Sequence, residues 1–224
     1  MLKFKILLFF TLSFGIKIVA QEKSFFSSEE NILKNIIPND KFDFWVLMHN
    51  HYGKDREVKL TGNKKNFETP SSGFNLSPNE SSYFYIVYGK GGTLNYITKL
   101  EDLKPFIGKA DNYQEAALLG VVDGYRIDYE FKNIAGNYHE DATNYYIDLG
   151  KVTSRDCPYA KTHFTLTVDK KSGGIANIKD NGTYSEIYKK DCKNNPRLKK
   201  LNEEYKAQQE QEKERLNPTK KKRR

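Results

Sequence analysis

Charged and apolar side chains alternate along residues 125–132. In a strand, this alternation places the charges on one face. Asp128 and Glu130 would then be near enough to serve as the acid and base of a glycosidase, provided that this face is a cleft. The interleaved cations favour a different interpretation, cross-strand ion pairs on a solvated face. The candidate catalytic residues are Arg126, Asp128, Glu130 and His163, the last from a later alternating segment.

Two histidine groups carry donor atoms suited to zinc. His49 and His51 would share a face if both lie in one strand, and His139 is followed by Glu140 and Asp141. No relation in the sequence brings the two groups together, and short motifs without structural context are mostly false positives. We therefore interpret these histidines as strand-end and loop residues, and expect neither a metal site nor a cofactor.

Nucleophilic chemistry has little support in the sequence. The chain has no Gly-x-Ser-x-Gly motif, the motif that presents the serine of many hydrolases. Cys157 and Cys192 could form a metal pair or a redox couple, but they are 35 positions apart without a Cys-x-x-Cys spacing or nearby histidines. A structural disulfide is the expected state of these two cysteines, in an oxidising compartment.

Residues 1–20 have the three-part layout of a secretory signal peptide. Lys3 and Lys5 precede an apolar run of 11 residues, about half of the ~20 that a membrane-spanning helix needs. Cleavage is expected after Ala20. Gln21, rather than a cysteine, would then be the mature N-terminus, so the precursor is not expected to be a lipoprotein. This bacterial-style signal predicts a secreted or periplasmic protein with no transmembrane anchor after cleavage.

The formal net charge of +8 is concentrated at the two ends of the chain. Residues 1–20 contribute +3 and residues 193–224 contribute +7, which leaves −2 for residues 21–192. Nucleic-acid-binding domains carry their positive charge on the folded surface, so specific nucleic-acid binding is not expected. The tail is either a solvated terminus or a contact for an anionic surface, and its anion-binding candidates are Lys220, Lys221, Lys222, Arg223 and Arg224.

The chain contains 15 Tyr, 14 Phe and 1 Trp. Rings in this number bury enough apolar area to offset the entropy of ordering, so a folded core is expected. Some tyrosines could be exposed to stack on a sugar or a partner protein, whereas a sheet covered on both faces would bury them. The tyrosines in question are Tyr83, Tyr85, Tyr88, Tyr145 and Tyr146.

The first half of the mature chain mixes helices and strands. Asn112 opens one helix, with Glu115 three positions later as in a capping box. Residues 50–81 are rich in Gly, Asn, Ser, Pro and Lys and are expected to form a long irregular excursion. The other expected elements are a helix over 28–37, a buried strand over 42–48, a helical turn over 101–107, and a hairpin of strands 83–88 and 93–100 with a glycine-rich turn.

The second half has the alternation typical of four antiparallel strands. Helices followed by a long meander predict an α+β fold, in which N-terminal helices pack on a mainly antiparallel curved sheet. This arrangement resembles cystatin-like and NTF2-like folds, and the hairpin Val168–Ile175 is similar to one in PepSY-type domains. No functional residue is carried over from these resemblances. The four predicted strands lie within residues 125–132, 145–149, 164–168 and 175–179.

No motif identifies a biochemical activity. We expect a secreted or periplasmic binding or interaction module without catalytic activity, whose partner is a protein or a glycan. The alternative is a secreted hydrolase-type enzyme that uses the polar sheet face. In the tail, Leu198, Leu201 and Tyr205 share one helical face and are expected to dock on the body. The expected units are a signal peptide (1–20), one globular α+β domain (21–192) and a charged helical tail with a basic C-terminus (193–224).

Overall fold

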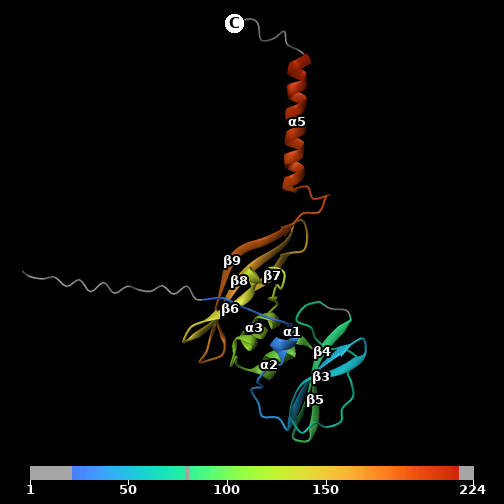
Figure 1. Cartoon of the computed structure of the whole chain (residues 1–224), viewed down its shortest axis with the longest axis vertical. Helices are drawn as coiled ribbons and strands as arrows, with labels where there is room; N and C mark the ends of the chain where they lie inside the picture. Colours follow the sequence, from blue (N-terminus) through green and yellow to red (C-terminus); the bar gives the residue numbers. More distant parts are fainter. Residues whose placement is uncertain (1–21, 79–80, 217–224) are drawn as a thin grey trace, which may run out of the picture.

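Two antiparallel sheets enclose a group of short helices (Figure 1). The computed structural model describes residues 22–78 and 81–216. The predicted signal peptide and the cations at 220–224 lie outside the described residues. The first sheet has the order β1-β6-β7-β8-β9, with β1 Ser24–Phe25, β6 Gly136–Glu140, β7 Asn144–Ser154, β8 Tyr159–Asp169 and β9 Ile175–Ile187. The second has the order β3-β2-β4-β5, with β2 Phe44–His51, β3 Lys54–Gly62, β4 Ser82–Lys90 and β5 Thr93–Ile97.

The helices begin at the capping residues that the sequence indicates. Ser28 Oγ accepts a hydrogen bond from Asn31 N at the start of α1. Asn112 Oδ1 accepts one from Glu115 N at the start of α3, and Glu115 Oε2 accepts from Asn112 Nδ2, so the two side chains also contact each other. The helices of the described residues are α1 Glu29–Leu33, the 3-10 helix η1 Leu100–Asp102, α2 Leu103–Ile107, α3 Tyr113–Val122, α4 Lys132–Ala135 and α5 Pro196–Leu216.

One apolar core joins the helices to both sheets. Helix α3 approaches the first sheet at Gly120, where a Cβ atom would lie 2.6 Å from Leu149 Cδ1 and 2.7 Å from Leu166 Cδ2. Because side chains alternate along a strand, the neighbours of Leu149, Asp148 and Gly150, face away from α3. This outer face of the first sheet carries the polar residues considered below.

The second sheet is covered on both faces. Its outer face forms a separate apolar cluster of Phe44, Val46, Met48, Tyr85 and Val87. Phe67, from the irregular segment that follows β3, packs on this cluster. The segment rejoins the sheet where Phe74 pairs with Phe84.

Two expectations about local structure are wrong. Residues 50–81 are not irregular throughout, because residues 54–62 form β3, which pairs with β2 through a tight turn at Tyr52 and Gly53, both at positive φ. Residues 125–132 are not a strand: only Arg126 forms a bridge, to Gly150, and the chain then turns into α4. The fold is α+β as expected, with two sheets in place of one.

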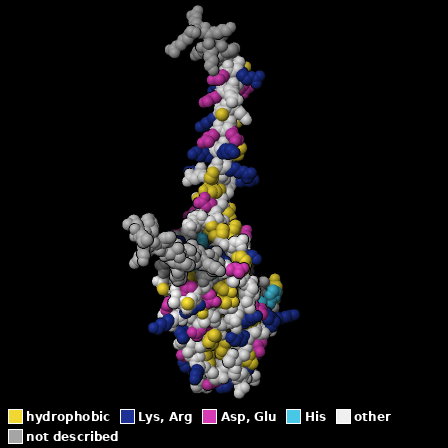
Figure 2. Space-filling model, turned by 60° about the vertical axis from the view of Figure 1, so that its left-hand side comes forward, with side chains coloured by type: hydrophobic (Ala, Val, Ile, Leu, Met, Phe, Trp, Pro, Cys, Tyr) yellow, Lys and Arg dark blue, Asp and Glu magenta, His cyan; other side chains and the backbone are white. Residues whose placement is uncertain are grey.

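The C-terminal helix projects from the body (Figure 1). No residue of α5 is buried, and Leu198, Leu201 and Tyr205 are 39%, 54% and 62% exposed, so the expected docking of this stripe is wrong. Figure 2 shows charges of both signs along the helix. None of the described helices is long and apolar enough to cross a membrane.

Cys157 and Cys192 lie at disulfide distance, with 5.8 Å between their Cα atoms. Cys157 is in the connection between β7 and β8, and Cys192 follows β9. The pair therefore ties the chain just before α5 to the far end of the first sheet.

Candidate ligand-binding site

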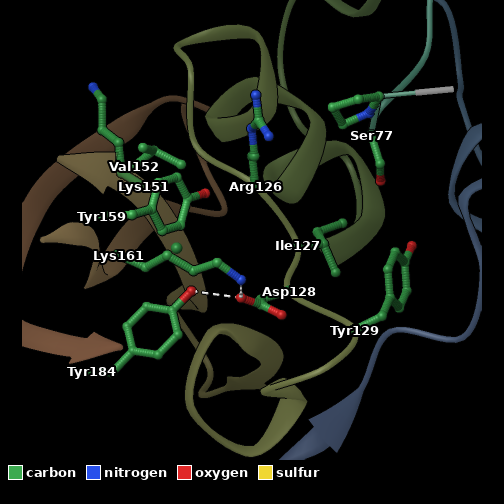
Figure 3. A pocket seen from close by; sticks show the side chains of 12 residues that line it. Ser77, Arg126, Ile127, Asp128, Tyr129, Lys151, Val152, Tyr159, Lys161 and Tyr184 are labelled. Atoms are coloured by element: carbon green, nitrogen blue, oxygen red, sulfur yellow. Dashed lines mark hydrogen bonds and ion pairs between the residues drawn. The ribbon is translucent and has the colours of Figure 1, made fainter. Parts of the chain in front are cut away.

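A cavity of about 250 Å³ opens on the outer face of the first sheet. Residues 126–129 form one wall, and the ends of β7, β8 and β9 form the other (Figure 3). Its polar and aromatic lining consists of Arg126, Asp128, Tyr129, Lys151, Tyr159, Lys161 and Tyr184.

Gly150 positions the wall formed by residues 126–129. Arg126 N donates to Gly150 O at 2.7 Å and Gly150 N donates to Arg126 O at 2.8 Å, which fixes this segment beside β7, next to the position where Gly136, the first residue of β6, pairs with Leu149. A Cβ atom at position 150 would overlap the hydroxyl of Tyr184. The glycine thus leaves room for Tyr184 to reach Asp128.

Asp128 is the centre of the polar network in the cavity (Figure 3). Its Oδ2 accepts hydrogen bonds from Lys161 Nζ at 2.8 Å and Tyr184 Oη at 2.7 Å. Its Oδ1 accepts from the backbone N–H groups of Glu130 and Phe131, both at 3.1 Å. Burial opposes ionisation, but the hydrogen bonds from Lys161 and Tyr184 outweigh it and hold the pKa of Asp128 below its usual value. The carboxylate is therefore ionised at neutral pH and fully engaged.

Two further cations line the cavity and, unlike Lys161, have no carboxylate partner among the described residues. Arg126 and Lys151 form no ion pair within residues 22–78 and 81–216, although Lys151 Nζ lies 4.6 Å from the ring centroid of Tyr125. Figure 3 shows the Arg126 side chain near the Tyr159 ring, and the Lys151 side chain extending outward from the cavity wall. No residue in the described ranges neutralises their charges.

Two tyrosine hydroxyls of the cavity, those of Tyr184 and Tyr129, are neutral at physiological pH. Burial and the hydrogen bond to Asp128 raise the pKa of Tyr184 far above its usual value. Burial also raises the pKa of Tyr129. Tyr159 lines the cavity, and its hydroxyl forms no hydrogen bond with any described residue. Its ring and hydroxyl can therefore contact a ligand directly.

The four candidate catalytic residues are only partly brought together. Arg126 and Asp128 line the cavity. Glu130 is outside the cavity lining: its Oε2 lies 3.9 Å from Lys161 Nζ, and its side chain is 74% exposed. His163 pairs with Gly150 across the strands, yet its ring is outside the cavity lining. Its Nε2 lies 2.9 Å from Asp148 Oδ1.

Asp148 forms a second polar cluster on the same face of the sheet. Its carboxylate accepts hydrogen bonds from Lys23 Nζ and Thr165 Oγ1, both at 2.6 Å, in addition to its contact with His163. Burial opposes ionisation, and these partners, Lys23 first, lower the pKa of Asp148 nevertheless. This cluster anchors the N-terminal strand on the sheet.

The two histidine groups lie on different sheets. His49 and His51 are in β2, with ring centroids 6.0 Å apart, and His49 stacks on Phe84. His139 is in β6 and stacks on Tyr146. In the described part of the chain, no group of three or more His, Cys, Asp or Glu residues could hold a metal ion.

The tyrosines that the sequence nominates have mainly structural contacts. Tyr85 is fully buried and donates to Asp55 Oδ2, and Tyr145 donates to Asp111 O. Tyr83, Tyr88 and Tyr146 are partly buried in ring or hydrogen-bond contacts. Tyr159 and Tyr184 are not among the residues predicted from the sequence, and the alternation of residues 125–132 places Tyr129 on a packed strand face, whereas all three line the cavity. No signal in the sequence groups these three residues.

Comparisons with known proteins assign no identity to this site. Neither a protein-family model, nor a curated protein, nor a solved structure matches the chain.

Proposed function

We propose that this protein is a secreted or periplasmic binding module without catalytic activity, and that the cavity beside Asp128 holds an anionic group of its ligand. The observation that carries the proposal is that the cavity lining includes Tyr159 and two cations, Arg126 and Lys151, that form no ion pair with any described residue. Binding pockets typically combine apolar and aromatic walls with a few polar groups that fix the ligand. A guanidinium is well suited to a carboxylate or a sulfate, because it donates two parallel hydrogen bonds.

The state of Asp128 supports binding over catalysis. A catalytic acid or base works best with a pKa near the working pH. The pKa of Asp128 is instead lowered, away from neutral pH, and its Oδ2 already accepts hydrogen bonds from Lys161 and Tyr184. Asp128 thus fits a structural role, in which it fixes residues 126–129 against the sheet.

The alternative proposal is a hydrolase-type enzyme that uses this face of the sheet. It is favoured by the approach of Asp128 and Glu130 to the same ammonium group, that of Lys161. It requires one of these carboxyl groups to carry a proton at working pH. The lowered pKa of Asp128 weighs against Asp128 as the protonated group.

The proposed compartment rests on the sequence of residues 1–20 and on the two cysteines. The cysteine pair at disulfide distance is compatible with an oxidising compartment. The +7 charge of residues 193–224 adds a proposed contact between the tail and an anionic surface.

The test is a screen of the purified mature protein, residues 21–224, against glycans, peptides and cell-envelope fractions. We expect a ligand whose binding is weakened at least fivefold by the double variant Arg126→Gln/Lys151→Gln, since two charged contacts are lost. The matched control, Lys34→Gln/Lys41→Gln, removes the same charge from exposed positions outside the cavity lining and should bind normally. Equal binding by both double variants would contradict the assigned site. Substrate turnover that one point substitution abolishes would overturn the binding-module proposal.

A further inference from the structure

A second cavity, of about 470 Å³, adjoins the first at Arg126. The two cavities share Ser77, Pro78 and Arg126 in their linings. Arg126 therefore lies between the two cavities. Lys151 lines the first cavity, and Arg155 lines the second. A ligand that occupied both would extend across this guanidinium.

The cations along this path are Lys151, Arg126 and Arg155. None of them forms an ion pair with a described residue. The Asp128 carboxylate is already neutralised by Lys161. Residues 21–192 carry a net charge of −2, so these cations are a local concentration on a body that is not basic. A series of cations along one path matches a ligand with repeated negative charges.

The backbone along this path is not available to a peptide strand. Peptides that add to a sheet edge pair with free backbone groups. The N–H and C=O of Arg126 are both bonded to Gly150, and Asp128 N donates to Ala135 O. The small positive area on a body with a net charge of −2 is also unlike the broad basic surface of a nucleic-acid-binding protein. The exposed groups are side chains, with cations next to the ring of Tyr159.

We infer that the two cavities together bind an acidic saccharide of at least two units, with Arg126 between successive anionic groups. This inference rests on the proposed function and adds the ligand class and the second half of the site. The anion is a carboxylate or a sulfate, which the guanidinium can hold in the same bidentate way.

Isothermal titration calorimetry of mature residues 21–224 tests the inference with galacturonate, tetragalacturonate, a heparin tetrasaccharide and hexaglutamate. We expect the tetrasaccharides to bind at least tenfold more tightly than the monosaccharide, because the second cavity adds contacts within one ligand. Arg155→Gln should weaken binding of the tetrasaccharides by about threefold, the scale of one exposed ion pair, and leave the monosaccharide unchanged. Arg126→Gln should weaken both, and Lys34→Gln neither. The tighter of the two tetrasaccharides identifies carboxylate or sulfate as the anion.

The outcomes separate this inference from the proposed function. Equal affinity for galacturonate and tetragalacturonate, or no effect of Arg155→Gln, would overturn the extended site while the first cavity stands. Hexaglutamate binding as tightly as the tetrasaccharides, or no binding of any acidic saccharide, would overturn the saccharide assignment. Binding that is indifferent to both Arg126→Gln and Lys151→Gln would contradict the proposed function itself.

Discussion

Replacing Asp128 by Asn should destabilise the protein by about 2–4 kcal/mol. The substitution removes the charge that accepts from Lys161 and Tyr184, and each hydrogen bond to a charged group contributes about 1.5–3 kcal/mol. Removal of one partner from a fully buried pair costs about 3–5 kcal/mol. The side chains of Asp128 and Lys161 are 9% and 21% exposed, so water compensates the remaining ammonium in part, and the lower range applies.

The effect should depend on pH with a defined sign. The pKa of Asp128 is lowered in the folded protein, so its stabilising contribution is present above the unfolded-state pKa of about 4 and is lost as the pH falls through the folded value. The difference in unfolding free energy between wild type and Asp128→Asn should therefore be constant from about pH 7 to pH 5 and shrink below about pH 4.

Urea unfolding followed by the fluorescence of Trp45 measures this difference. Trp45 is the only tryptophan in the chain and is 4% exposed, so its emission reports loss of the core. Tyr184→Phe removes one donor and should cost about 1 kcal/mol. A loss below about 0.5 kcal/mol for Asp128→Asn, or a difference that stays constant down to about pH 2.5, would refute the role of this carboxylate in fixing residues 126–129.

Three further predictions concern the body and the tail. Glu115→Ala should cost about 2–4 kcal/mol in urea unfolding, because the N–H groups of Ile37 and Asp111 lose a buried acceptor; a cost below about 1 kcal/mol would contradict this. Intact-mass analysis should find no free thiol at Cys157 or Cys192 without reduction, and reduction should lower the free energy of unfolding by about 3–4 kcal/mol in the chain-entropy model. Alkylation of both cysteines under native conditions would show that the disulfide does not form. Removal of residues 193–224 should change the free energy of unfolding by less than about 1 kcal/mol, since α5 buries no residue. It should also abolish any binding to anionic vesicles, which in the full chain must weaken steeply with salt. Equal vesicle binding by the full and truncated chains would exclude a role for the tail charge.

Local signals in the sequence predict the elements that local chemistry decides. The capping pair Asn112 and Glu115, the buried strand at 42–48 and the hairpin over 83–100 are all confirmed. The strand over 54–62 was missed because it pairs only with β2 at the edge of its sheet and is mostly exposed, so no apolar alternation marks it.

The strand prediction for residues 125–132 failed for a tertiary reason. β6 already occupies the edge of β7 as far as Leu149, which leaves Gly150 as the only bridge for Arg126. The Asp128 side chain then accepts from the backbone of Glu130 and turns the chain away. For the same reason the cavity could not be predicted: it depends on Tyr184, which reaches Asp128 from 56 positions away.

A crystal structure of residues 21–224 with tetragalacturonate, or with the glycan that binds best in the screen, tests the central claim most directly. The account predicts ligand density between Arg126 and Tyr159, with an anionic group on the guanidinium, and no displacement of Asp128 from Lys161. Ligand bound only along α5 or on the second sheet, with the cavity beside Asp128 vacant at saturating concentration, would contradict it.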